Sequence, residues 1–138
     1  MDIFEKKRRS EIMARVRSSN TMPEVRVRKL LHRMGYRFRL HRKDLPGTPD
    51  IVLSAYDSVV LVHGCFWHRH RGCRDATTPR TRKRFWIRKF SENVGRDGKN
   101  AVALRKLGWR ILIVWECELR DEIYLSRRLV RFLGPPDG

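Results

Sequence analysis

The spacing of hydrophobic residues along the chain predicts a helix followed by a strand in its first third. After Thr21, apolar side chains recur three or four positions apart, as on one face of a helix, at Val27, Leu30, Leu31 and Met34. Gly35 is a suitable left-handed end for this helix. Three apolar residues then alternate with polar ones, which is the spacing of a half-buried strand: Tyr36, Phe38 and Leu40.

The rest of the chain predicts three more strands and three more helices. Residues 50–55 and 58–64 are short β-branched runs with a tight polar connection between them. The nearly continuous apolar run at 109–116 suits a strand that is covered on both faces. Helical spacing is found over the segments 81–94, 99–107 and 121–133. This order of elements predicts an α/β fold, in which helices flank a mixed sheet.

Composition and charge point to a nucleic acid as the partner. The chain has 138 residues and a formal net charge of +17, and 24 of its 32 basic residues are arginine, whose planar fork suits phosphate and guanine edges. The alternative is that the charge only keeps the protein soluble. We expect a basic segment at 1–20 that contacts DNA, one domain at 21–133 and a flexible tail at 134–138. There is neither an export signal nor an apolar run of about 20 residues, so we expect a cytoplasmic protein without a membrane span.

Cysteine and histidine spacing predicts a structural zinc site. Cys65, His70 and Cys73 lie within nine residues, and thiolate and imidazole ligands at such spacing can enclose one Zn²⁺ ion. Cys117 follows the strand predicted at 109–116, which could lie beside the one at 58–64 and so supply the fourth ligand. In the alternative interpretation, Cys117 is an ordinary buried cysteine and His70 belongs to a basic loop.

A carboxylate and two imidazoles are candidates for catalysis. Asp50 directly precedes a predicted strand, where its carboxylate can bind a hard cation such as Mg²⁺, although a turn cap is the common role of such a residue. His63 and His68 are both candidate general bases, and either could instead be structural.

Two aromatic residues between these histidines suggest contact with DNA. We expect Phe66 and Trp67 to be exposed, and exposed rings in a basic protein can slip between base pairs and kink the duplex. The alternative is that both rings belong to the core.

Four segments together resemble the very short patch repair (Vsr) DNA mismatch endonucleases: LPGTPDIV, VHGCFWHRHRGC, TRKRFWIRKFSENVGRD and LGWRILIVWECEL. The likeness spans roughly residues 8 to 120. Members of that family have a restriction-endonuclease-like fold and use Mg²⁺ to nick one strand beside the thymine of a T:G mismatch, which arises from deaminated 5-methylcytosine. The resemblance implies the same fold, lesion and cofactor here.

The resemblance also implies roles for individual residues. Asp50 and the backbone carbonyl of Val62 would bind Mg²⁺, although the family has threonine at position 62, so a role for its hydroxyl would be lost. His68 would be the general base, and Glu24 and His63 would support it, but Glu24 also fits a capping box with Thr21. The four zinc ligands match those predicted from spacing. Residues expected to contact DNA are Met13, Phe66, Trp67 and Trp86 by resemblance, with Asn93 and Arg96 as further phosphate or base contacts.

The expected partner is mismatched double-stranded DNA, bound by a monomer, with a MutL-like repair factor as a further contact. Two other functions remain open from the residues alone. The first is a zinc-stabilised nucleic-acid-binding module without catalysis, and the second is a nuclease of the same fold that acts on another mismatch or a restriction-type site.

Overall fold

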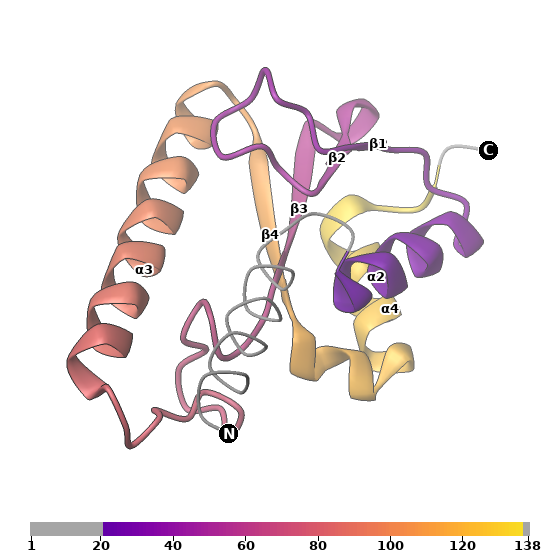
Figure 1. Cartoon of the computed structure of the whole chain (residues 1–138). Helices are drawn as coiled ribbons and strands as arrows, with labels where there is room; N and C mark the ends of the chain where they lie inside the picture. The colour runs from indigo at the N-terminus through magenta and orange to yellow at the C-terminus, as the bar shows by residue number, and fades with distance from the viewer. Residues whose placement is uncertain (1–20, 137–138) are drawn as a thin grey trace.

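In a computed structural model of the chain, residues 21–136 are described, and they form a four-stranded sheet with helices on both of its faces (Figure 1). The helices are α2 (Met22–Arg33), α3 (Lys83–Lys106) and α4 (Glu122–Leu133). The strands are β1 (Arg39–Leu40), β2 (Ile51–Leu53), β3 (Ser58–His63) and β4 (Arg110–Trp115). Short 3-10 helices follow two strands, η1 at Ser54–Tyr56 and η2 at Glu116–Arg120. This arrangement confirms the predicted mixed α/β class.

The sheet is mixed, with the strands in the order β1-β2-β3-β4. The pairs β1·β2 and β2·β3 are antiparallel, whereas β3 and β4 are parallel, as a crossover through helix α3 allows. The register runs from Ser58 opposite Arg110 to His63 opposite Trp115. The carboxyl ends of β3 and β4 therefore meet, as the placement of Cys117 beside Cys65 requires.

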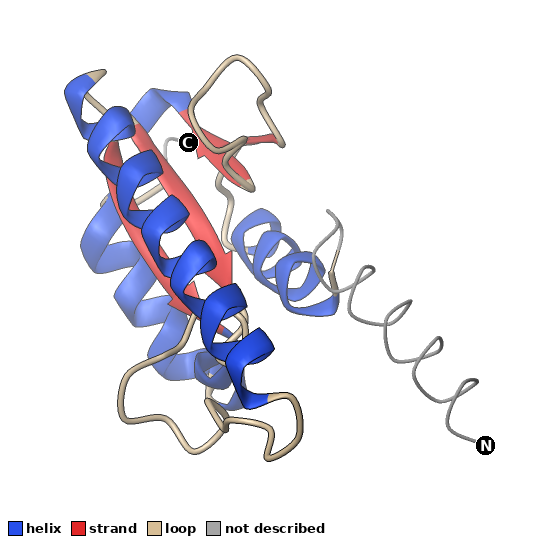
Figure 2. Ribbon diagram, turned by 60° about the vertical axis from the view of Figure 1, so that its left-hand side comes forward, coloured by secondary structure: helices blue, strands red, loops and turns tan. Residues whose placement is uncertain are grey.

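Each face of the sheet has its own hydrophobic core. Figures 1 and 2 show α3 lying along one face, with α2 and α4 on the other. On the α2 and α4 side, the buried cluster includes Leu31, Val60, Val114 and Leu129. On the α3 side, Leu104 packs on Val52 and Val59. Along β4, Leu112 and Val114 are buried, but Ile111 and Ile113 are only partly covered, so the prediction of a strand covered on both faces holds for one face.

The two helices predicted at 81–94 and 99–107 are one continuous helix, which corrects the prediction. The gap between the two predicted helices contains Gly95 and Gly98, and both lie inside α3. A glycine in a helix interior costs about 1 kcal/mol relative to alanine. Burial of Trp86 and Phe90 before the glycines and of Leu104 after them offsets that cost by holding both halves against the protein.

The strand predicted from the alternation at 36–40 is also shorter than expected. Only Arg39 and Leu40 pair with β2, and Leu40 is exposed. Tyr36 is an anchor instead, because its buried ring packs edge-to-face on Tyr56 and its hydroxyl donates to the carbonyl of Gly134. The alternation of apolar and polar residues at 36–40 therefore reflects the packing of Tyr36 against Tyr56 and Gly134 rather than a long strand.

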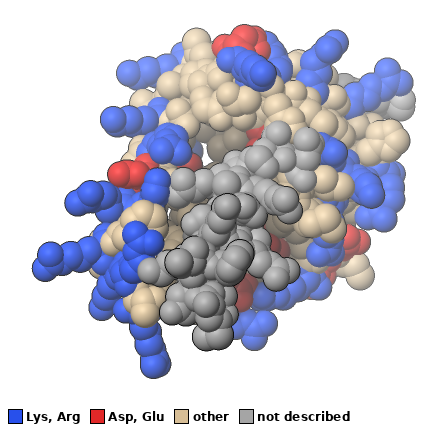
Figure 3. Space-filling model, viewed as in Figure 1, with Lys and Arg blue, Asp and Glu red and all other residues tan. Residues whose placement is uncertain are grey.

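Basic side chains surround the face shown in Figure 3, and acidic ones are few there. Among the described residues, no helix is long and apolar enough to cross a bilayer. The expected DNA-binding segment at 1–20, which includes Met13, lies outside the described residues.

Candidate active site and metal centre

Two carboxylates and an imidazole meet where β2 begins. Asp50 directly precedes β2, and its Oδ2 accepts a hydrogen bond of 2.9 Å from the backbone N–H of Val62 in the neighbouring strand β3. Glu24, in the first turn of α2, is only 2% exposed. One ligand atom each from Glu24, His41 and Asp50 lies within 4.8 Å of the other two. The group has the composition of a site for a divalent cation.

Glu24 takes part in helix capping only through its backbone. Its N–H donates to Thr21 Oγ1 at 3.4 Å, which confirms Thr21 as the N-cap of α2. Its carboxylate, however, points into the protein, where Oε2 contacts His41 Nε2 at 2.8 Å and Arg28 Nη1 at 3.2 Å. The reciprocal side-chain bond of a capping box is therefore replaced by contacts in the candidate site.

The environment of Asp50 favours a bound cation. Burial raises the pKa of Asp50 to about 6, and the charge of Glu24 adds to the rise, while the Val62 N–H opposes it. Two carboxylates in so little water repel each other when both are ionised. A divalent cation bound between them would remove this repulsion, so the residues present fit a divalent-cation site at the position that the sequence predicts.

A second group contains both candidate bases and an aspartate that sequence analysis missed. His68 Nδ1 lies 2.6 Å from Asp97 Oδ2 on helix α3. The ring of His63 stacks on that of His68, with centroids 3.9 Å apart and 9° between the planes. A carboxylate that holds Nδ1–H fixes the tautomer in which Nε2 is free to accept a proton. The arrangement suits His68 as a general base.

His63 lies in a different environment from His68, and we therefore expect the two rings to have different roles. It is 6% exposed, and burial, followed by the proximity of His68, lowers the pKa of His63 to about 4. At neutral pH its ring is therefore uncharged. A neutral ring stacked on His68 can support that side chain without adding a second positive charge beside it.

The two groups are joined through consecutive residues of β3. Val62 donates to Asp50, and the next residue, His63, stacks on His68. Adjacent residues of a strand are about 3.3 Å apart along its axis. The carboxylate pair and the imidazole pair thus border the same short stretch of β3.

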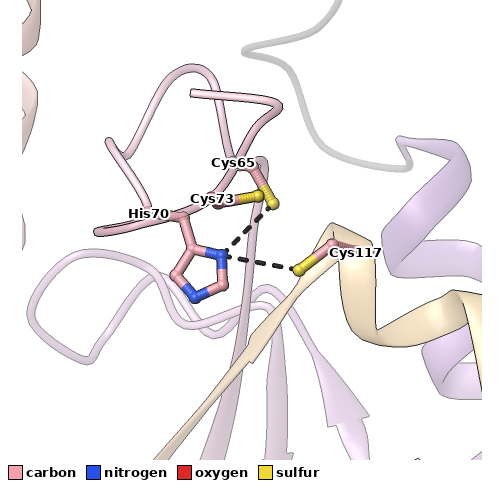
Figure 4. A group of neighbouring side chains, drawn as sticks. All are labelled: Cys65, His70, Cys73 and Cys117. Atoms are coloured by element: carbon pink, nitrogen blue, oxygen red, sulfur yellow. Dashed lines mark hydrogen bonds between the residues drawn. The ribbon is translucent and has the colours of Figure 1, made fainter. Parts of the chain in front are cut away.

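The four predicted zinc ligands come together just beyond the carboxyl ends of β3 and β4. Figure 4 shows Cys65 and His70 from the segment after β3, and Cys117 from the segment after β4, grouped with Cys73. His70 Nδ1 lies 3.6 Å from Cys65 Sγ and 3.5 Å from Cys117 Sγ. Bond lengths of about 2.3 Å to sulfur and 2.05 Å to nitrogen place tetrahedral S and N ligands about 3.6 Å apart.

Two features describe the surroundings of this cluster. Burial raises the pKa of the Cys65 thiol to about 12, so a metal ion that binds there has to displace the thiol proton. The His70 ring stacks on Trp115 with centroids 4.2 Å apart, which holds it toward the sulfur atoms. All four ligands are protein side chains, so the site can hold a structural metal ion and leaves no position for a reacting water.

Of the aromatic residues expected to contact DNA, the two tryptophans are buried and Phe66 is half-buried. Trp67 is 8% exposed and Trp86 is 6% exposed, and they form a cluster with Phe66 and Phe90. Their ring centroids are 5.1 to 5.9 Å apart. The expectation of an exposed Trp67 was wrong, because α3 supplies two aromatic residues one turn apart that pack against the loop. Insertion into DNA would require this cluster to open.

The two remaining predicted DNA contacts lie in different environments. Asn93 is 9% exposed, and its side-chain amide donates to the carbonyl of Trp67 at 3.2 Å. The structure therefore shows Asn93 holding the loop that carries His68, rather than facing a base. Arg96 is exposed on the outside of α3 and remains a predicted DNA contact.

Sequence reasoning overlooked Asp97 and His41 because neither lies in a motif with the residue that it contacts. Asp97 is 29 positions from His68, and His41 is 17 positions from Glu24. A signal for Asp97 was present, because it lies four residues after Asn93 and thus on the same side of a helix. That signal requires the helix to continue past Gly95, which was not expected.

Comparison with known proteins supports an assignment to a family of enzymes. A family model described as DNA mismatch endonuclease Vsr matches residues 1–75. Type II nicking enzyme V.XorIIP of Xanthomonas oryzae pv. oryzae is 52% identical over 134 residues, which are 97% of this chain and 98% of that protein. Type II nicking enzyme V.NmeAIP of Neisseria meningitidis is 43% identical, over 96% of this chain and 94% of that protein. DNA mismatch endonuclease Vsr of Escherichia coli K12 is 44% identical, over 91% and 80%.

Proposed function

Because this chain belongs to the Vsr family of DNA mismatch endonucleases, we propose that it nicks one strand of duplex DNA beside the thymine of a T:G mismatch. The chain is a DNA endonuclease, and the proposal concerns its lesion, cofactors and residue roles. The observation that carries it is the His68–Asp97 pair at 2.6 Å, which borders the same stretch of β3 as Asp50.

Each side chain of the site has a separate role in phosphodiester hydrolysis. The carboxylate of Asp97 accepts a hydrogen bond from Nδ1–H of His68, and Nε2 of His68 takes a proton from the attacking water, which leaves an imidazolium that Asp97 stabilises. Asp50 and the Val62 carbonyl would hold Mg²⁺, with Glu24 supporting them from α2. When bound, Mg²⁺ supplies positive charge that stabilises the transition state and the leaving oxygen. His63 keeps the His68 ring in place by stacking.

We assign the cluster of Cys65, His70, Cys73 and Cys117 to a structural zinc ion. Three thiolates and one imidazole are a common zinc set, and the distances match tetrahedral coordination. The loop that contains His68 begins after β3, and this cluster fixes the start of that loop to the segment after β4. Its role is then to position the base, and the reaction takes place at the other groups.

We also propose that the sheet is restriction-endonuclease-like and that residues 21–133 are one endonuclease domain. A mixed sheet with a cation-binding aspartate before β2 supports that assignment. Met13 in the basic segment 1–20, with Phe66, Trp67 and Trp86, would enter the duplex beside the mismatch. A wobble pair stacks less regularly than its neighbours, so inserting a ring there requires less unstacking energy. The partners proposed are mismatched DNA and a MutL-like repair factor, with a monomer as the active form.

A nicking assay tests this function. Labelled duplexes with a T:G pair, other mismatches or only matched pairs are incubated with protein and Mg²⁺, and strand breaks are resolved on denaturing gels. Nicks confined to the thymine strand of the T:G duplex are expected. Asp50→Asn should bind the duplex and leave it intact. Asp57→Asn is the matched control, because Asp57 is exposed and its left-handed backbone suits asparagine.

Other outcomes would identify the alternatives. Binding without cleavage by the unmodified protein would indicate a zinc-stabilised binding module. Cleavage of another mismatch or of a matched site would keep the nuclease and change its target. The full loss of activity in Asp57→Asn would show that the assay reports stability rather than chemistry.

A further inference from the structure

The carboxylate site contains an imidazole that magnesium does not need. His41 Nε2 lies 2.8 Å from Glu24 Oε2, and the side chain is 21% exposed. Mg²⁺ is bound in proteins almost entirely through oxygen atoms and water. Imidazole nitrogen is instead a good ligand for first-row transition metals. The donor set of Glu24, His41 and Asp50 therefore mixes nitrogen and oxygen in a way that points beyond Mg²⁺.

A turn of the backbone places His41 beside this site. His41 has a left-handed φ of 48°, a conformation that histidine, like asparagine and aspartate, adopts more often than other residues with a side chain. Its N–H donates to the carbonyl of Asp50 at 3.1 Å, one step beyond the last pair of β1 and β2. The end of the β1 and β2 pairing therefore places the His41 side chain next to Glu24 and Asp50.

The separation of the side chains suits two ligands of one ion. Neighbouring ligands of a six-coordinate ion, with bonds of about 2.1 Å, lie about 3.0 Å apart. The observed distance between His41 Nε2 and Glu24 Oε2 is 2.8 Å, so the pair needs to open by only a few tenths of an ångström. Asp50 supplies the third ligand atom within 4.8 Å of both.

A purely positioning role for His41 explains less. Glu24 belongs to α2, whose first turn is capped by Thr21, and its Oε2 is already contacted by Arg28 from the next turn. The orientation of this carboxylate therefore does not depend on His41 alone.

We propose that His41 is a direct nitrogen ligand in the Glu24–Asp50 site, and that it makes the site favour Mn²⁺ and similar transition-metal ions over Mg²⁺. The inference rests on the proposed function, because it concerns the cation site of the proposed nuclease. It adds a residue and a class of metal to that site. The four-residue cysteine and histidine cluster, which we assign to zinc, is separate from it.

Electron spin echo spectroscopy of bound Mn²⁺ tests the proposal directly. The probe is Mn²⁺ alone, added to full-length protein that retains its zinc, without DNA. A coordinated imidazole produces nuclear modulation from ¹⁴N, and labelling the protein with ¹⁵N-histidine shifts that signal. We expect the ¹⁴N signal in the unmodified protein and its loss in His41→Asn, with Mn²⁺ affinity about tenfold weaker and Mg²⁺ affinity changed less than about threefold.

Asparagine is the substitution of choice because it tolerates the left-handed backbone at this position. His32→Asn is the matched control, since His32 is exposed on α2, and its ¹⁴N signal and affinities should be those of the unmodified protein. Thermal melting and zinc content show whether His41→Asn is folded. If His41→Asn is not folded, the test uses unmodified protein labelled with ¹⁵N-histidine. Loss of the ¹⁴N signal on labelling then supports a histidine ligand, and persistence of the ¹⁴N signal overturns the proposal.

The outcomes separate this inference from the proposed function. If Mn²⁺ binds and the T:G duplex is nicked, but the unmodified protein shows no ¹⁴N signal or folded His41→Asn retains it, then His41 is not a ligand and only this inference fails. Equal weakening of Mn²⁺ and Mg²⁺ by His41→Asn would also overturn the metal preference. If neither ion binds and no nick forms with either, the proposed function fails with it.

Discussion

Replacing Asp97 by asparagine should slow nicking roughly 10- to 150-fold without weakening the binding of DNA. Asp97 Oδ2 lies 2.6 Å from His68 Nδ1, and both side chains are 28% exposed, so the pair is largely shielded from water. Asparagine keeps the size of the side chain but removes its charge, which is needed most when His68 becomes protonated during the reaction.

The size of the effect follows from this one contact. A hydrogen bond to a charged group contributes about 1.5 to 3 kcal/mol. If that contribution is realised in the transition state, each 1.36 kcal/mol corresponds to a tenfold change in rate. The expected slowing is therefore about 10-fold at the low end and about 150-fold at the high end.

Single-turnover nicking of a T:G duplex, with protein in excess, measures the chemical step apart from product release. Glu92→Gln is the matched control, because it removes one exposed acidic charge from the same helix and should change the rate less than twofold. The reasoning is refuted if Asp97→Asn nicks within threefold of the unmodified rate while His68→Ala is inactive. It is refuted as well if Asp97→Asn loses zinc or DNA affinity in proportion to its activity.

Three further predictions address the cation, the zinc cluster and the fold. Asp50 must release its proton to bind a cation, and its pKa is about 6. Calorimetric titration should therefore show an Mg²⁺ affinity that falls about tenfold for each pH unit below 6 and stays constant above pH 7. An affinity that does not change between pH 5 and 7 would contradict this. Removing zinc with a chelator, or substituting Cys117→Ser, should lower the melting temperature, whereas removing Mg²⁺ should stop nicking with no loss of structure. Gly47→Ala should destabilise the fold by about 1 to 2 kcal/mol in urea unfolding, because φ is +74° and the new Cβ would lie 2.6 Å from the Asn100 side chain. Adding Asn100→Ala should recover only the part due to the clash, and full recovery would show that the backbone conformation has no cost.

Local sequence was a sound guide wherever a short segment determines its own structure. The helix after Thr21, the strands that became β3 and β4, and the last helix were predicted close to their observed bounds, whereas β2 is shorter than the run at 50–55 that predicted it. The sequence also indicated that β3 and β4 could lie side by side, which brings Cys117 to Cys65, His70 and Cys73; the structure shows that the two strands are parallel. Predictions failed where distant contacts outweigh local preference, as at Gly95 and Gly98, which packing on both sides keeps inside α3.

The sequence by itself determined the charge of the protein, most of its secondary structure and the cysteine and histidine residues proposed to bind zinc, because these depend on composition and on spacing within short segments. Only the tertiary structure decided which carboxylate contacts which imidazole. Asp97 contacts His68 because α3 is continuous and lies along the sheet. The Glu24 carboxylate contacts His41 and lies near Asp50 instead of completing the capping box of α2. Such contacts join positions far apart in the chain, and their energy comes from burial and opposite charge at distances that exist only once the helices have packed on the strands.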